Sequence, residues 1–396
     1  MRQYNLALVA AMLISAILPG CGGSDTSSQE PVKISNSTYA YTNTLNDKDE
    51  RGDRNSSKIE FKSQISFGDS LSDVGTYAVG TIAALGGGQF TVNSPGVKNW
   101  TALMAAQFGL SAPCAAQTGL DGDPAQGFYA PVVNHAGCTA YAQGGARVTS
   151  PVGIGNKLTG GANETLGFLT VPVVKQIQNH LEANNGKFHD DEIVFILAGA
   201  NDVFFQLGLL QAGAIDPNTA VTAMAQAANE LVIAINSKII RHGAQYVVVV
   251  NIPDITVTPL GATFNTPTSG LVDTMINTFN NQLKLGLAGN DKVLYVDAHE
   301  ESKNQYINPG AYGLTNVTDT ACDLSPAKNP LSSSLICTPY NLIPGITGNY
   351  LFSDMVHPTP YGYNLMANLV SKEMLGKGWR WRKHKDNGRN KEDKNW

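Results

Sequence analysis

The stretch Ile65-Ser66-Phe67-Gly68-Asp69-Ser70-Leu71-Ser72-Asp73 decides the fold. We expect residues 65–67 to end a short buried strand and Gly68-Asp69 to turn the chain, which places Ser70 at the tip of the turn. Such a position lies at the carboxyl edge of a sheet, where open α/β folds bind their ligands. Backbone N–H groups just after the turn lack partners and face an incoming oxyanion. The stretch therefore predicts Ser70 as a nucleophile, although a turn serine that caps the next helix would fit the same residues.

Three later blocks supply residues that a serine nucleophile needs. Gly199-Ala200-Asn201-Asp202 follows the apolar run 193–197, again at the end of an expected strand. Asp354-Met355-Val356-His357 places an acid three residues before a histidine. The block Ala140-Tyr141-Ala142-Gln143-Gly144-Gly145-Ala146 lies between the first and last blocks. These blocks therefore contain candidates for a base, for a group that orients the base and for donors to an oxyanion.

His357 is the base candidate because it is the histidine with a local acid, Asp354, which would hold the imidazole and stabilise its protonated form. The other histidines fall in or beside expected surface helices, in the C-terminal tail, or away from any such acid: His180, His189, His242, His384, His135 and His299. The order Ser, Asp, His is that of the α/β-hydrolases, but no Gly-x-Ser-x-Gly elbow surrounds Ser70. A hydrogen-bonded surface histidine is the alternative interpretation of His357.

The four blocks, from Gly68 to His357, resemble those of the GDSL, or SGNH, hydrolase family, which supply Ser, Gly, Asn and His in this order. The resemblance implies a three-layer α/β/α domain with a mostly parallel, flavodoxin-like central sheet. It implies the triad Ser70, Asp354 and His357, acting on acyl esters. It also implies an oxyanion hole formed by the N–H groups of Ser70 and Gly145 and the amide of Asn201.

One feature of the second block leaves an alternative open. The family's block begins with Asn, whereas this chain has Ala140, so the choice of Gly145 over Gly144 stays undecided at this point. Asp69, Asp73 and Asp202 are expected to shape loops rather than to perform chemistry. Asn201 has an alternative role as a turn residue after a strand.

The periodicity of apolar residues predicts an α/β domain over residues 59–376. Continuous apolar runs at 65–67, 193–197, 246–251 and 293–296 are typical of strands buried on both faces of a parallel sheet. Helical spacing marks 99–108, 171–184, 219–242, 270–287 and 360–374. Strands that alternate with helices give three layers.

Composition is that of an ordinary folded protein with a large core. The chain has 396 residues, of which 42% are hydrophobic and 15% charged, with a net charge of -5. This mild charge gives no reason to expect nucleic-acid binding. No Cys/His grouping has the spacing of zinc ligands, and no cofactor is expected.

The ends of the chain suggest export. Residues 1–20 have a positive start and an apolar stretch, the layout of a signal peptide. Leu18-Pro19-Gly20-Cys21 resembles a bacterial lipoprotein signal, which predicts lipidation of Cys21 and membrane anchoring toward the periplasm or exterior; the alternative is an ordinary secreted enzyme. Residues 21–58 are expected to be a polar tether. Residues 377–396 form a basic tail whose tryptophans would suit an anionic membrane, or simply a solvated terminus.

The remaining cysteines indicate an oxidising compartment because their number is even. Four cysteines allow three pairings, which the sequence does not separate. We favour the local pairs Cys114–Cys138 and Cys322–Cys337, since each would close a Gly/Pro/Asn-rich loop beside an active-site block.

The substrate is expected to be an acyl ester, of a lipid-like kind because of the expected anchor and the apolar stretch 203–210. That stretch would line an acyl pocket, or else form a helix packed in the core. Deacetylation of a polysaccharide and lipid acyl transfer are alternatives on the same fold. A non-catalytic surface-binding lipoprotein is the alternative from another class. The sequence does not give the oligomeric state.

Overall fold

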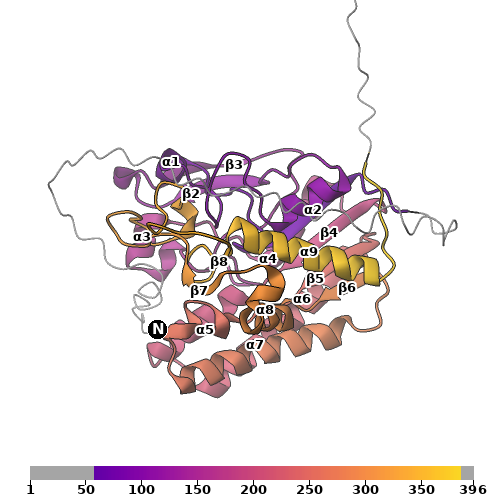
Figure 1. Ribbon diagram of the computed structural model, residues 1–396. Coiled ribbons are helices and arrows are strands. Elements are labelled where there is room, and N and C mark those ends of the chain that lie inside the picture. The colour runs from indigo at the N-terminus through magenta and orange to yellow at the C-terminus, as the bar shows by residue number, and fades with distance from the viewer. Residues whose placement is uncertain (1–57, 385–396) are drawn as a thin grey trace, which may run out of the picture.

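The main sheet consists of parallel strands in the order β1-β4-β5-β6 (Figure 1). The structure, a computed structural model, describes residues 58–384. The strands are β1 (Ser63–Gly68), β4 (Glu192–Leu197), β5 (Tyr246–Val250) and β6 (Val293–Val296). The four apolar runs of the sequence therefore form adjacent parallel strands, as predicted.

The segment 139–143 extends this sheet beyond β1. Ser66 and Ala140 form a parallel bridge, and the N–H of Tyr141 donates to the carbonyl of Ser66 at 2.8 Å. If the segment 139–143 is counted as the second strand in chain order, the order across the sheet is 2-1-3-4-5, as in flavodoxin-like folds. The order reverses between β1 and β4, so the crevice at their carboxyl ends is where such a fold binds its ligand.

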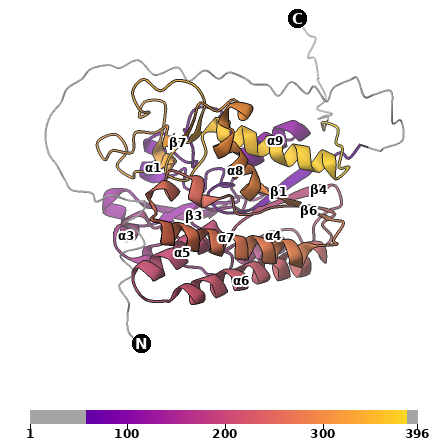
Figure 2. The same ribbon diagram turned by 60° about the horizontal axis from the view of Figure 1, so that its bottom comes forward.

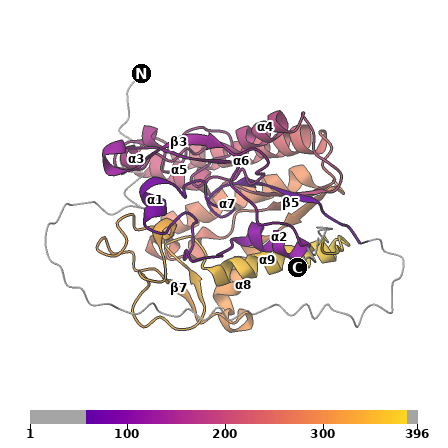
Figure 3. The same cartoon turned by 90° about the horizontal axis from the view of Figure 1, so that it is seen from above.

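Side chains of the sheet alternate between two apolar clusters, because successive residues of a strand point to opposite faces. Val194 and Ile196 pack with helices α4 (Val173–Ala183), α5 (Ala200–Gln211), α6 (Pro217–Ala234) and α7 (Thr266–Leu287). Ile193, Phe195 and Leu197 pack with α2 (Trp100–Phe108) and α9 (Pro360–Gly376). Figure 2 shows α4, α5, α6 and α7 below the sheet and α9 above it, and Figure 3 shows the same layers from another side. The expected α/β/α architecture is confirmed.

The predicted helices are present with small shifts at their ends. They are α2 (Trp100–Phe108), α4 (Val173–Ala183), α6 (Pro217–Ala234), α7 (Thr266–Leu287) and α9 (Pro360–Gly376). The end of the helix expected at 219–242 is a π-helix, Ile235–Ile240. Helix α5 (Ala200–Gln211) covers the stretch 203–210, for which a core helix was one of the two interpretations. Helices α1 (Gly80–Ala84), α3 (Ala162–Leu166) and α8 (Ala298–Ile307) were not predicted.

Small elements surround the carboxyl edge of the sheet. Strands β2 (Gln117–Asp121) and β3 (Tyr129–Asn134) form an antiparallel hairpin, and β7 (Asn316–Thr320) pairs with β8 (Tyr350–Phe352) in parallel. Short 3-10 helices complete this layer: Pro124–Gln126, Lys157–Thr159, Ile255–Val257, Gly261–Thr263, Pro309–Tyr312 and Ser334–Ile336.

The described end of the chain packs against the domain. Trp379 is buried, and the ring of Trp381 meets that of Phe108 edge-on at 5.3 Å. The N–H of Arg382 donates to the carbonyl of Ile59. Folded structure therefore continues past residue 376, and these tryptophans are packed into the protein rather than presented to a membrane. Within residues 58–384, no helix has the length and apolar character needed to cross a bilayer.

Candidate active site

Ser70 lies in a tight turn directly after β1. The carboxylate of Asp69 accepts the N–H of Leu71 at 3.1 Å, and the carbonyl of Asp69 accepts the N–H of Ser72 at 3.1 Å. Gly68 precedes the turn with φ of +148°, and a Cβ there would collide with the carbonyl of Leu197 on β4. The turn thus needs glycine, and the chain leaves the sheet with Ser70 facing the crevice.

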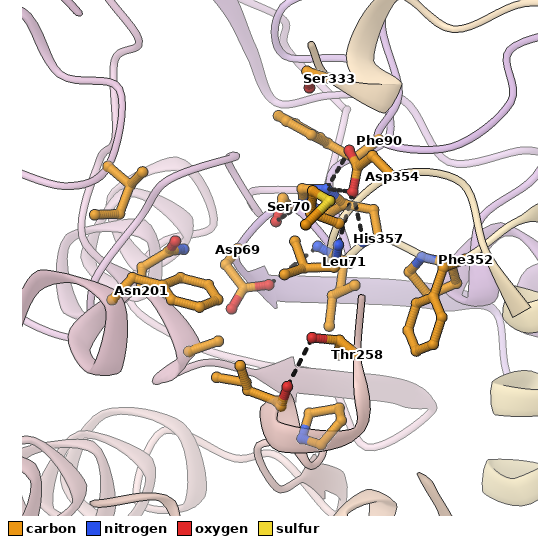
Figure 4. Close-up of a pocket in the computed structure, with 18 of the residues that line it drawn as sticks. Asp69, Ser70, Leu71, Phe90, Asn201, Thr258, Ser333, Phe352, Asp354 and His357 are labelled. Carbon is orange, nitrogen blue, oxygen red and sulfur yellow. Dashed lines mark hydrogen bonds and ion pairs between the residues drawn. The ribbon is translucent and has the colours of Figure 1, made fainter. Parts of the chain in front are cut away.

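Ser70, His357 and Asp354 form a continuous hydrogen-bonded chain (Figure 4). Nε2 of His357 lies 2.9 Å from Oγ of Ser70, and Nδ1 lies 2.9 Å from both carboxylate oxygens of Asp354. A carboxylate can only accept, so Nδ1 carries the proton and Nε2 is left to accept one from the serine. The three residues predicted from the sequence are therefore in contact, in the arrangement that nucleophilic catalysis requires.

Asp354 is fixed from several sides. Its carboxylate accepts the N–H groups of Val356 at 3.0 Å and His357 at 2.8 Å, so the acid and the base share one tight turn. Burial by itself would raise the pKa of this carboxyl, but the charge of protonated His357 and the hydrogen bonds it accepts hold the pKa well below its ordinary value. The group is an anion at any pH at which a histidine base functions.

A further donor to Asp354 comes from the loop that the disulfide Cys322–Cys337 closes. The N–H of Ser334 donates to the second carboxylate oxygen at 2.7 Å. The buried side-chain amide of Asn93 in turn binds this loop, since Nδ2 lies 3.1 Å from the carbonyl oxygens of both Ser334 and Cys337. Sequence reasoning missed Asn93 and Ser334, because nothing in their local sequence marks a contact so distant along the chain.

An aromatic ring covers the base. Phe90 packs against the imidazole of His357 with ring centroids 4.9 Å apart, and its carbonyl accepts the hydroxyl of Tyr363 at 3.1 Å. Thr91 donates its hydroxyl to the carbonyl of Pro358 at 2.9 Å. The segment around Phe90 therefore limits the orientations open to His357, and this too was missed from the sequence.

The glycines of the second block differ in what their N–H groups do. Gly144 donates to the carboxylate of Asp73 at 2.9 Å, and Ala146 donates to the carbonyl of Gln143. Among residues 58–384, the N–H groups of Gly145 and Ser70 have no hydrogen-bond partner, and both residues line the same pocket. Gly145 has φ of +78°, and a Cβ there would strike the carbonyl of Ile154. Of the two glycines left open above, Gly145 is the one with a free donor.

Asn201 enters the pocket from the first turn of α5. Nδ2 donates to the carbonyl of Ala146 at 3.0 Å, which uses one of its two hydrogens and orients the amide. Asp202 holds the same loop by accepting the N–H of Val148 and pairing with Arg147 at 2.9 Å. Asp73 and Asp202 therefore shape the loop around Gly145, which agrees with their expected roles.

Asp69 carries a carboxylate oxygen that finds no partner in the described part of the chain. Burial raises the pKa of Asp69 to about 7, against the N–H of Leu71 and the nearby charge of His357, which both lower it. The side chain is 1% exposed and lies next to the nucleophile. Near neutral pH this acid is thus present in both protonation states.

His180 departs from the sequence expectation of a surface position. It is 1% exposed, and its ring stacks on Phe188 with centroids 4.4 Å apart. Burial lowers its pKa to about 4. Helix α4 places His180 on its buried side, so the imidazole is a neutral ring packed in the core.

The pocket in front of Ser70 is mostly apolar. Figure 4 shows Asn201 on one side of the serine and Phe352 on the other. Phe90, Phe168 and Phe204 line it together with aliphatic side chains. The stretch 203–210 is a helix whose Val203 and Leu207 are buried in the core, as the second interpretation predicts, and its Phe204 also lines the pocket.

One group in the described part of the chain has the composition of a metal site. Ligand atoms of Asp254, Asp273 and His299 lie within 4.8 Å of one another. The ammonium group of Lys303 lies 4.0 Å from both carboxylates and offsets part of their charge. None of these three residues belongs to the triad of Ser70, Asp354 and His357.

Both local disulfides are present. Cys114 joins Cys138 with Cα atoms 5.1 Å apart, and Cys322 joins Cys337 with Cα atoms 6.1 Å apart. The pairing favoured from the sequence is confirmed. Disulfides are typical of proteins in oxidising compartments.

The geometry agrees with the comparison of the chain with known proteins. A model of the GDSL-like lipase/acylhydrolase family matches residues 65–370. The chain belongs to this family. Two GDSL esterase/lipases of Arabidopsis thaliana are 28% and 27% identical over 95 and 96 residues, each match covering 24% of this chain and 25% of the relative. The chain thus matches about a quarter of the length of these GDSL relatives.

Solved structures also align with this GDSL family member. An extracellular lipase from Streptomyces rimosus and a phospholipase A1 from Streptomyces albidoflavus are each 13% identical with a TM-score of 0.38. Both alignments cover 78% of this chain, and they cover 99% and 98% of the two structures respectively.

Proposed function

We propose that the protein hydrolyses carboxylic acyl esters of a lipid-like kind through an acyl-enzyme on Ser70. The observation that carries this proposal is the chain of contacts from Ser70 Oγ to His357 Nε2 and from His357 Nδ1 to Asp354, each of 2.9 Å. Membership of the GDSL-like lipase/acylhydrolase family supports it. The apolar lining of the pocket supports a lipid-like acyl group.

In this mechanism, His357 accepts the hydroxyl proton while Ser70 attacks the ester carbonyl. Asp354 keeps Nδ1 protonated and stabilises the imidazolium that forms. The negative charge on the substrate oxygen would be met by the N–H groups of Ser70 and Gly145 and by the second amide hydrogen of Asn201. His357 then returns its proton to the leaving alcohol. A water molecule attacks the acyl-enzyme by the same steps, and the carboxylic acid is released from Ser70.

The membrane anchor belongs to the same proposal. Cys21 and the expected tether lie outside the described residues, so the support for lipidation is the sequence Leu18-Pro19-Gly20-Cys21 alone. An anchored enzyme would meet its lipid-like substrate at the membrane surface.

The test is covalent labelling and turnover on the purified full chain. Wild-type protein should hydrolyse p-nitrophenyl esters and react once with a fluorophosphonate probe, at the peptide that contains Ser70. Ser70→Ala should neither turn over nor label. A protein that is inert toward short and long esters and toward the probe would refute the proposal and favour a non-catalytic binding protein.

A further inference from the structure

One face of α8 lines the pocket with polar side chains. Ala298, Glu301, Ser302 and Gln305 all line it, and their spacing of three and four residues places them on the same side of the helix. Met366 and Leu369 of α9, which line the same pocket, are apolar. The polar face of a helix normally turns to water, so a polar face turned into a mostly apolar pocket calls for an explanation.

Gln305 is the clearest sign of a ligand. It is 7% exposed, and within residues 58–384 its amide has no hydrogen-bond partner. Its amide atoms are not among the fully enclosed polar atoms that lack a partner, so they are open to the space of the pocket. An amide carries two donors and an acceptor, which a bound molecule can use there in place of water. The amide therefore points to a polar group of a bound molecule.

The charges near Gln305 define what that group can be. Glu301 and Asp254 both line the pocket and both carry a carboxylate, and the buried carboxylate of Asp254 accepts the N–H and the hydroxyl of Thr256. Of the described residues that line the pocket, none is Lys or Arg. Lys303 lies 4.0 Å from Asp254 and offsets part of its charge from outside the lining, and Glu301 interacts with the hydroxyl of Tyr312. The net field still opposes an anion.

We propose that this face of α8 is the subsite for the alcohol part of the ester and that it takes the hydroxyl groups of an uncharged polyol such as glycerol. The carboxylate of Glu301 accepts a hydroxyl, and the amide of Gln305 both donates and accepts. A phosphate attached to the same alcohol is repelled by the two carboxylates. This inference rests on the proposed ester hydrolysis and adds the class of alcohol to it.

The experiment compares esters of one acyl chain that differ only in the alcohol: 1-monolauroylglycerol, propyl laurate and 1-lauroyl lysophosphatidic acid. We expect kcat/KM for the glycerol ester to exceed that for the propyl ester by about tenfold, the effect of two hydrogen bonds. The lysophosphatidic acid should be the poorest substrate. Propyl laurate reports the ester chemistry alone, so it separates the two proposals.

Variants assign the effect to α8. Gln305→Leu should remove most of the preference for the glycerol ester over propyl laurate, measured as the ratio of the two kcat/KM values. Glu301→Gln should raise turnover of the lysophosphatidic acid several-fold relative to the propyl ester. Asn304→Leu changes an amide on the same helix that does not line the pocket, and should alter neither ratio.

The outcomes are distinct. Equal turnover of the glycerol and propyl esters by the wild type, with ratios unchanged in Gln305→Leu and Glu301→Gln, overturns the subsite and leaves ester hydrolysis standing. If Gln305→Leu does not fold, the isosteric Glu301→Gln decides the matter by the same ratios. A wild-type protein that hydrolyses none of the three esters, nor p-nitrophenyl esters, overturns both proposals.

Discussion

At the scale of single residues, the site depends on which groups have partners and which do not. Asp354 accepts hydrogen bonds from several backbone N–H groups and from the imidazole of His357. Asp69, next to the nucleophile, has a carboxylate oxygen without a partner among the described residues. The two acids differ accordingly in pKa, with Asp354 lowered and Asp69 raised to about 7. Their surroundings rather than their residue type assign them to different tasks.

The first prediction concerns the base and its partner. His357→Ala should lower kcat by several orders of magnitude, because Ser70 then has no proton acceptor. Asp354→Asn should cost less than His357→Ala but still at least about a hundredfold, since it disturbs the proton on Nδ1. Steady-state kinetics with circular dichroism to check folding measures both. Parental turnover in a folded His357→Ala protein would mean that another group is the base.

The second prediction concerns Asp69 and pH. Because its folded pKa is raised to about 7 from 3.8, the folded state binds a proton that the unfolded state has released between these values. This contribution to stability is present at low pH and is lost as pH rises through about 7. Wild-type protein should therefore lose more thermal stability between pH 5 and pH 8 than Asp69→Asn does.

Thermal melts of both proteins at the two pH values give the comparison. Asp73, whose pKa is raised to about 6 by burial, contributes in the same direction to both proteins and cancels. An identical loss of melting temperature in wild type and Asp69→Asn would show that Asp69 does not titrate in this range.

At the scale of elements, the loop from Cys322 to Cys337 supports the triad. It provides the N–H of Ser334 to Asp354, and its Leu331 and Leu335 line the pocket. The loop is tied down by its disulfide and by Asn93, whose own N–H donates to the carbonyl of Cys337 at 2.7 Å. Both ties act on the position of a catalytic carboxylate from outside the active site.

The third prediction is that opening this disulfide lowers activity and stability together. The Cys322→Ser/Cys337→Ser variant should lose about 3 kcal/mol of unfolding free energy, the chain-entropy cost for a loop of 15 residues. Its kcat should fall because Ser334 holds Asp354 less firmly. Denaturant unfolding and ester kinetics measure the two effects, and Cys114→Ser/Cys138→Ser is the matched control, which should leave kcat nearly unchanged.

The fourth prediction is that Asn93→Asp lowers kcat about tenfold or more with little change in KM. The substitution keeps the oxygen that accepts the N–H of Gln89 but removes the donors to Ser334 and Cys337. Asn349→Asp, at a half-buried amide that donates to Gly313, is the control. If both variants have parental kcat, Asn93 does not position the triad.

At the scale of the whole molecule, the sheet places distant segments side by side. Ser70 follows β1 and Asn201 follows β4, and these two strands are neighbours at the point where strand order reverses. Residues 379–381, which follow α9, pack against the start of β5 and the end of α2. The ring of Trp379 contacts Tyr246, and that of Trp381 contacts Phe108. The apolar clusters on the two faces of the sheet thus fix the strands that carry Ser70 and Asn201.

The fifth prediction concerns the full chain in a bacterial host. Cys21 should carry lipid, and the mature enzyme should partition with membranes, because a diacylated cysteine anchors a protein stably. Cys21→Ser should release a soluble enzyme or leave the precursor unprocessed. Mass spectrometry of the mature N-terminus is the measurement, and an unmodified Cys21 in a processed protein would indicate plain secretion.

The sequence by itself determined the buried strands, marked Ser70, Asp354 and His357 as the candidate triad, and favoured the two local disulfide pairs without excluding the other pairings. Each of these leaves a local mark: an apolar run, a turn after it, an acid three residues before a histidine, or a polar loop between two cysteines. Such marks arise from backbone geometry and from burial on both faces of a strand, which act over a few residues.

Only the tertiary structure decided which glycine has a free N–H, which amide holds the loop of Ser334, and that α8 turns a polar face to the pocket. Gly144 and Gly145 are neighbours of the same type, and they differ because Asp73 reaches one and not the other. Asn93 and Ser334 are 241 residues apart along the chain, and Gln305 is an ordinary helix residue until its lack of a partner is known. Hydrogen bonds between distant segments depend on the packing of the whole core, which no local pattern encodes.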